Sequence, residues 1–180
     1  MARPEYHDQQ TLERLFANTL IDPKNGVRDH GILRFMYGAP VHPIELIRLK
    51  THDLVNDKGE LKTGDHGVVR AEVSFSGRER PLPILDPILI SALQNWGNFR
   101  LESGWGVTKA GFLDLDQPFF LISKNKGFNV STSIADGATK RNSDSMNRVI
   151  RARYAQNKVT GSVGSALRTW TLNRNQAAFH

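Results

Sequence analysis

The chain has 180 residues, of which 39% are hydrophobic and 23% charged, and this ordinary globular composition predicts one folded domain over residues 1–180. Because the sequence has no cysteine, disulfide frameworks, iron–sulfur clusters and thiol catalysis are excluded. No run approaches the roughly 18 apolar residues of a membrane span, and the polar start lacks a signal sequence. We therefore expect a soluble, cytoplasmic protein without a membrane partner.

The net charge of +6 is concentrated toward the carboxyl end of the chain. Residues 137–180 hold eight lysines and arginines against one aspartate, whereas residues 1–136 together carry a net charge of −1. Such a basic segment is typical of contact with a polyanion, which in a cytoplasmic protein usually means nucleic acid. The alternative is a solvated helix face without a partner.

Helical spacing of apolar residues predicts two helices in the first forty residues, over 10–20 and 28–37, with turn residues between them. A short third helix is predicted over 44–50, because Pro43 suits the first position of a helix. Two helices therefore meet at a sharp corner near His42.

The next segment has strand character. Two runs rich in β-branched and aromatic residues, 68–75 and 82–84, flank a glycine-containing loop and predict a β-hairpin. Asp86 as an N-cap and Pro87 at the first position then begin a helix that extends through Trp96.

Beyond residue 103 the pattern predicts a loop with one apolar strand, 119–122, and then helices over 143–156 and 164–173. The first of these helices has an apolar stripe and carries several arginines on its other faces. The apolar stripe consists of Met146, Val149, Ile150 and Tyr154. The predicted fold class is α+β, mainly helical, with a small antiparallel sheet.

Three local motifs follow one another along this framework. The stretch 37–54 matches the pattern Gly-Leu-Arg-x-x-Glu-Leu-x-x-Leu-x-x-x-Asp-Ile at Glu45, Leu46, Leu49 and Asp53. The sequence Arg-Glu-Arg-Pro-Leu-Pro from Arg78 is similar to Lys-Glu-Arg-x-x-Pro, and Ser-Ala-Leu-Arg-Thr from Ser165 is similar to a His-x-Leu-Arg box. With the order of elements, these motifs resemble the catalytic domain of the tyrosine recombinase, or phage integrase, family.

The resemblance implies a site built for DNA breakage and rejoining. In that family a tyrosine attacks a phosphodiester, two arginines stabilise the charge of the transition state, and a hairpin lysine and histidines move protons. By register, the first arginine position holds His42 and the lysine position holds Phe75, with Arg78 or Arg80 as alternative cations that could reach the lysine position. The histidine of the box is Ser165, and Arg168 alone keeps the residue type of the family.

These departures predict a catalytically inactive protein. Tyr37 and Tyr154 lie on apolar stripes and are expected in the core, and all three tyrosines, Tyr6 included, precede Arg168. The family's C-terminal tyrosine segment and N-terminal core-binding domain have no counterpart in the chain. The histidines lack metal-ligand spacing, so neither a metal site nor a cofactor is expected.

The preferred interpretation is a DNA-binding protein related to site-specific recombination, from a mobile element or prophage, that contacts duplex DNA mainly through phosphates. The predicted contact residues are Arg78, Arg80, Lys140, Arg141, Arg148, Arg151, Arg153 and Arg168. His42 is either a residual phosphate donor or a polar corner residue. A second interpretation is an interaction module or regulator that binds a full-length recombinase or another protein, and a third is an active recombinase completed by another chain.

Overall fold

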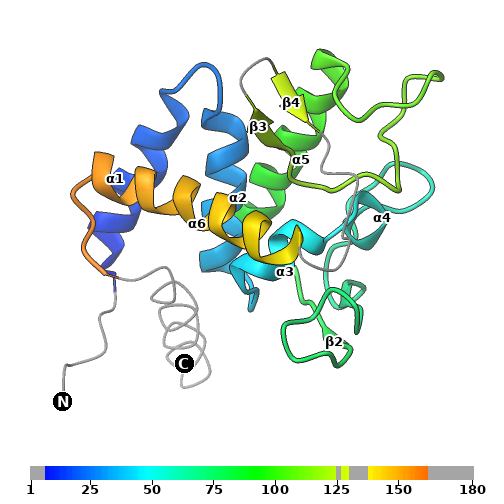
Figure 1. Ribbon diagram of the computed structural model, residues 1–180, viewed down its shortest axis with the longest axis horizontal. Coiled ribbons are helices and arrows are strands. Elements are labelled where there is room, and N and C mark those ends of the chain that lie inside the picture. The colour runs from blue at the N-terminus through cyan, green and yellow to red at the C-terminus, as the bar shows by residue number, and fades with distance from the viewer. Residues whose placement is uncertain (1–6, 125–126, 130–137, 162–180) are drawn as a thin grey trace.

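The computed structural model describes residues 7–124, 127–129 and 138–161 (Figure 1). In this part of the chain the elements are, in order, α1 (Gln9–Leu20), α2 (Gly26–Gly38), α3 (Pro43–Arg48), α4 (Thr51–Leu54), β1 (Val68–Val69), β2 (Arg80–Pro81), α5 (Pro87–Ser103), β3 (Ile122–Lys124), β4 (Gly127–Asn129) and α6 (Ala138–Gln156). The predicted fold class, mainly helical α+β with small antiparallel sheets, is confirmed. The helix expected over residues 164–173 lies outside the described residues.

The helix starts follow from their capping residues. The side chain of Asp8 accepts a hydrogen bond from the backbone N–H of Thr11 at 2.8 Å and begins α1. Asp86 does the same for Ile88 at the start of α5, as predicted. That helix continues beyond Trp96 to Ser103, and it ends where Gly104 adopts the left-handed conformation, with φ of 68°.

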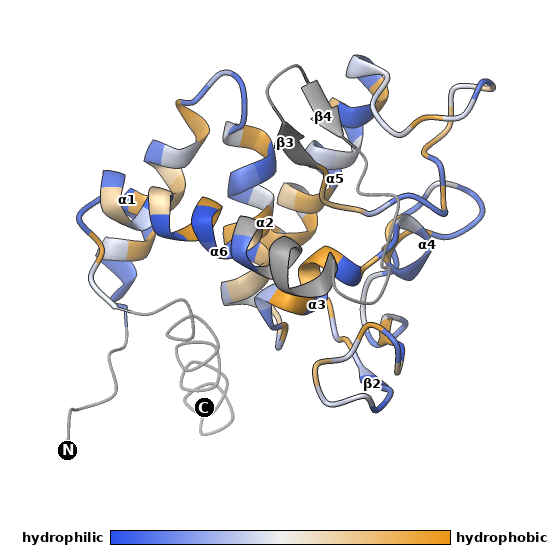
Figure 2. Cartoon of the chain, viewed as in Figure 1, coloured by the Kyte–Doolittle hydropathy of each residue, from blue (hydrophilic) through white to orange (hydrophobic). Residues whose placement is uncertain are grey.

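Helix α2 is the centre of the fold. It packs against α1 and α5, while α6 crosses it and contacts α1, α2 and α3 (Figure 1). Buried residues occur on every side of α2, as expected for a helix surrounded by protein. Figure 2 shows hydrophobic colours gathered where α2, α3 and α5 meet. The core therefore lies between these helices, with α6 as one outer layer.

The first hairpin is shorter than the sequence predicts. Strands β1 and β2 are antiparallel, with Val68 opposite Pro81 and Val69 opposite Arg80. The predicted continuation of the first strand to residue 75 is wrong. The backbone N–H groups of Val73 and Ser74 donate to the carbonyl of Arg70, at 3.0 and 2.9 Å, and this bonding curls the chain into turns.

The carboxyl-terminal half also differs in detail from the prediction. The strand predicted over 119–122 shares only Ile122 with β3, Ile122–Lys124, which pairs with β4. The preceding apolar residues, Phe119, Phe120 and Leu121, are buried outside any strand. The backbone of Phe119 bonds to helical parts of the fold, because its N–H donates to the Leu49 carbonyl at 2.9 Å and its carbonyl accepts from the Trp96 indole at 2.8 Å. Helix α6 begins at Ala138, earlier than the predicted residue 143.

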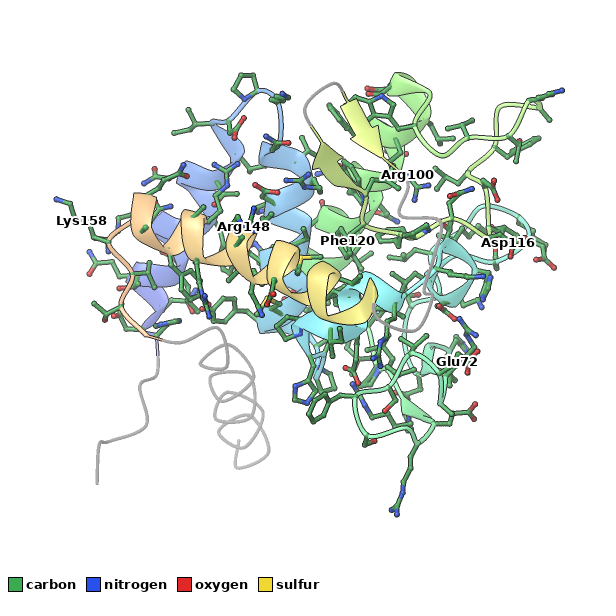
Figure 3. The ribbon with its side chains drawn as sticks, viewed as in Figure 1. Glu72, Arg100, Asp116, Phe120, Arg148 and Lys158 are labelled. Atoms are coloured by element: carbon green, nitrogen blue, oxygen red, sulfur yellow. The ribbon has the colours of Figure 1, made fainter. Side chains whose placement is uncertain are left out.

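Arg100, labelled in Figure 3, holds the loop after α5 in place. Its side chain is fully buried, and its guanidinium donates hydrogen bonds to acceptors on this loop and on α4. The acceptors are the carbonyls of Trp105, Gly106, Pro118 and Phe119 and the hydroxyl of Thr51. Burial lowers the pKa of Arg100 to about 10, against the opposing effect of Asp114.

Among the described residues, no helix combines the length and the apolar character needed to cross a membrane.

Candidate nucleic-acid interface

The outer face of α6 carries the exposed cations of the basic segment. Arg148, labelled in Figure 3, and Arg151 are both exposed and lie one turn apart on this face. Together with Asp144, Asn147 and Ala152 they line an open depression of about 490 Å³. In the part of the chain that the structure describes, neither arginine forms an ion pair within 4.0 Å. Their guanidinium groups are therefore available to an external anion.

Arg153 points the opposite way, and its predicted role as a DNA contact does not fit its position. Its side chain is buried between α6 and α2, where Nε donates to Asp29 at 2.8 Å and Nη2 contacts Asp22 at 2.5 Å. Asp29 is in turn bonded to Arg28 at 2.8 Å. The charge of Arg153 is compensated by Asp29 and Asp22 inside the protein, so this residue is not part of the candidate interface.

The remaining basic residues of the prediction are spread between two regions. Lys140 and Arg141 belong to the first turns of α6, but their side chains lie outside the described set, as does the whole segment with Ser165 and Arg168. Arg78 is exposed on the turn before β2, while Arg80 is half-buried. The structure describes the surroundings of Arg78 and Arg80, whereas Arg168 lies outside the described residues.

His42 and Phe75, which the sequence comparison predicted at the positions of an arginine and a lysine, lie together. Their rings stack with centroids 5.0 Å apart and an angle of 29° between the planes. His42 precedes the first residue of α3, and Phe75 lies on the turn between β1 and β2. The two residues are 33 positions apart, so no local pattern in the sequence predicts their contact; only the alignment with the recombinase motifs links them.

Glu45 joins α3 to the same turn. Its buried carboxylate accepts from the backbone N–H of His42 at 2.8 Å, from the N–H of Phe75 at 3.0 Å and from the Arg80 guanidinium at 2.5 Å. A buried carboxylate requires such compensation, and here Arg80 supplies the charge. The predicted role of Arg80 as a phosphate contact is therefore opposed by its ion pair with Glu45.

Arg48, at the end of α3, completes this contact with the turn. Its Nη1 donates to the carbonyls of Val73 and Ser74 at 3.4 and 3.3 Å, while its Nε is buried without a hydrogen-bond partner. No carboxylate of the described residues pairs with this guanidinium. His42, Glu45 and Arg48 are spaced three residues apart on one face of α3, a signal that the sequence contains but that the prediction did not use.

The two tyrosines that the structure describes are core residues, as predicted. Tyr37 and Tyr154 are buried and lie within hydrogen-bond distance of each other. Burial raises the pKa of both phenols, to about 12 in Tyr154. Neither hydroxyl is accessible to a phosphodiester, so neither can serve as a nucleophile in this conformation.

The described residues also lack a metal centre, since no group of three or more histidine, aspartate or glutamate side chains is placed to hold an ion. Comparisons of the chain with protein-family models, with curated proteins and with solved structures find no match.

Proposed function

We propose that this protein binds duplex DNA through phosphate contacts and does not break or rejoin the strands. In this proposal it is a non-catalytic relative of the recombinases that it resembles, associated with site-specific recombination of a mobile element or prophage. The observation that carries the proposal is the pair of exposed arginines on α6, Arg148 and Arg151, within a segment of net charge +7. Guanidinium groups are planar, permanently charged donors that suit phosphate oxygens.

The proposed lack of catalysis is supported by the chemistry of the residues at the register positions. A phosphoryl-transfer site needs fixed positive charge on the non-bridging oxygens, and His42 and Phe75 supply none when the imidazole is neutral. Arg80, the nearby cation on β2, is already paired with Glu45 at 2.5 Å. The inward location of Tyr37 and Tyr154 removes two of the three tyrosines from consideration as nucleophiles.

Salt-dependent binding of a labelled duplex, followed by fluorescence anisotropy, tests the proposal. We expect a Kd of ~10⁻⁴ to 10⁻⁶ M near physiological salt, as for non-specific phosphate contacts. Replacing Arg148 and Arg151 together by alanine should weaken binding and flatten the slope of log K against log salt by roughly two, about one for each lost contact.

A matched control separates the α6 face from total charge. The double variant Lys58→Ala, Lys109→Ala removes the same two charges from exposed loop residues and should leave the slope close to that of the parent protein. Equal losses in the two double variants would contradict an interface on α6. Absence of binding even at low salt would overturn DNA binding altogether and favour the alternative of a protein-interaction module.

A further inference from the structure

We propose that Phe75 is a stacking platform for an unpaired base of DNA. This inference rests on the proposed DNA binding and adds the form of DNA that the protein prefers, namely a duplex with an extrahelical or unpaired nucleotide. It is carried by the ring stack of His42 and Phe75, by the bonds that hold the turn, and by two arginines without a carboxylate partner among the described residues, Arg48 and Arg78.

The ring of Phe75 is presented on a rigid support with one open face. The side chain is 69% exposed although its inner face stacks on His42. The backbone before it is held by Arg48 and its own N–H by Glu45, so α3 fixes the turn at three points. Gly77 closes the turn with φ of 68°, a conformation that favours glycine, and donates its N–H to Ser74 at 3.2 Å. The ring is therefore pre-organised before any ligand arrives.

The surroundings of the ring favour a nucleotide over an apolar protein segment. Apart from Gly77, the residues that follow Phe75, from Ser76 to Arg80, have polar or charged side chains. A protein interface of standard size buries about 800 Å² on each partner with a hydrophobic centre, which one aromatic ring among polar residues cannot provide. A nucleobase, by contrast, needs one aromatic face, and the phosphates beside it need cations.

Two cations near the ring are not compensated by carboxylates in the described structure. Arg48 donates only to carbonyls, and Arg78, three residues beyond Phe75, is exposed without an ion pair. Arg80 is paired with Glu45, and the exposed carboxylates of this turn are Glu72, which pairs with Arg70, and Glu79. Where the recombinase resemblance places an arginine and a lysine, this chain thus offers an aromatic stack, with Arg48 bonded to the backbone just before Phe75 and Arg78 three residues after it. Such an arrangement binds a base by its π face and the adjoining phosphates by charge.

The test compares two DNA molecules that differ in one nucleotide. One is a perfect duplex, and the other carries a single extrahelical 2-aminopurine, a fluorescent adenine analogue whose emission falls when it stacks. We expect the parent protein to bind the second duplex about fivefold or more tightly than the first, the lower end of the stacking contribution of one base. Binding should also quench the 2-aminopurine emission.

Four variants identify the origin of this preference. Phe75→Ala should abolish both the preference and the quenching while it leaves binding of the perfect duplex unchanged. Phe75→Leu should behave like the alanine variant, because leucine is apolar but has no aromatic face, whereas Phe75→Trp should retain the preference. Phe112→Ala is the matched control, since Phe112 is also 69% exposed but lies on a different loop. The exposure of both side chains predicts that all four variants fold, which circular dichroism verifies.

The outcomes separate this inference from the proposed function. If the parent protein binds both duplexes equally in a manner that depends on Arg148 and Arg151, the stacking platform is refuted and DNA binding stands. If Phe75→Ala lowers the affinity for both duplexes equally, or if Phe75→Leu keeps the preference for the 2-aminopurine duplex, the role of Phe75 is not base stacking. The inference is then likewise refuted. If neither duplex is bound at low salt, DNA binding itself is refuted, and the platform with it.

Discussion

The hydroxyl groups of Tyr37 and Tyr154 lie 2.6 Å apart in the core, at the place where α2 meets α6. A third group continues the chain of hydrogen bonds, because His7 Nδ1 is 2.5 Å from the Tyr37 hydroxyl and His7 Nε2 is 2.7 Å from the Thr160 carbonyl. A carbonyl can only accept, so Nε2 carries the hydrogen and, in the neutral ring, Nδ1 accepts from Tyr37. Because the Tyr37 hydroxyl hydrogen is used in the bond to His7, the Tyr154 hydroxyl donates to the Tyr37 oxygen. This chain links the start of α1 to the end of α6.

The tyrosine pair predicts a loss of stability at alkaline pH. Burial raises the pKa of both phenols, to about 12 in Tyr154, whereas an unfolded tyrosine ionises near 10. Below pH 10 both states are protonated and the folded state keeps its full stability. Between pH 10 and 12 the unfolded state loses protons that the folded state retains, so the free energy of unfolding falls by about 1.4 kcal/mol per pH unit for each such tyrosine.

The measurement is the melting temperature from pH 8 to 12 for the parent protein and for Tyr154→Phe. The variant should be about 1 kcal/mol less stable at pH 8, because Tyr37 loses a donor, and should show a shallower alkaline decline. In the parent protein, well below the Tyr154 pKa of about 12, absorbance near 295 nm should show the ionisation of these two phenols only as the protein unfolds. Phenolate formation from Tyr37 or Tyr154 in the folded protein at pH 10 would contradict this account.

Arg153 and Arg151 are predicted to differ sharply in their effect on stability. Arg153→Ala leaves Asp29 buried with Arg28 as its remaining cation, and we expect a loss of about 3 kcal/mol, toward the lower end for a broken buried pair. Arg151→Ala removes an exposed side chain and should change stability by less than about 0.5 kcal/mol. Chemical denaturation of the two variants measures both values. Equal stabilities would show that the buried network contributes nothing.

The position of Arg153 shows which part of α6 could be predicted from the sequence. The apolar stripe of Met146, Val149, Ile150 and Tyr154 was predicted, and these residues are buried except Val149, which is half-buried. Arg153 lies seven residues after Met146 and three after Ile150, so its spacing places it on the same stripe. The net charge of the segment predicts Arg153 to be one more surface cation. Its carboxylate partners, Asp22 and Asp29, lie more than a hundred residues away in the sequence, so the local pattern does not predict that the charge is compensated in the core.

The candidate site shows the same division between local and tertiary information. The capping residues and the Pro43 and Pro87 signals are local, so the starts of α3 and α5 were predicted. The meeting of His42 and Phe75 depends on how the turn before β2 folds onto α3. In that turn the carbonyl of Arg70 accepts hydrogen bonds from the backbone N–H groups of Val73 and Ser74, and strand propensity alone does not predict this bonding.

The carboxylate of Asp22 predicts an acid-induced loss of stability. Burial opposes its ionisation, but hydrogen bonds from Arg153 and from the backbone of Asn25 and Lys24 outweigh this effect and lower the pKa to about 2. Its contribution is therefore complete above the unfolded pKa near 3.8 and is lost as the pH falls from about 4 toward 2. Asp22→Asn should be less stable than the parent at pH 6 and should lose less stability over this range. Thermal denaturation between pH 2 and 6 provides the comparison, and parallel pH profiles for the two proteins would contradict the prediction.

The last prediction concerns the chemistry that the recombinase resemblance implies. Because Tyr37 and Tyr154 are buried with raised pKa values, and because the proposed recombinase register would put His42 and Phe75 at the positions of two cations, we expect no covalent protein–DNA intermediate. Incubation with a nicked duplex substrate that traps cleaved ends, followed by denaturing electrophoresis, should show only free protein. The double variant Phe75→Lys, His42→Arg restores the two charges of the family pattern but no nucleophile, so it should bind duplex DNA more tightly and still form no adduct. A denaturation-resistant adduct that maps to any tyrosine of the chain would show that the protein is an enzyme, and an adduct at Tyr37 or Tyr154 would also show that the core opens to the substrate.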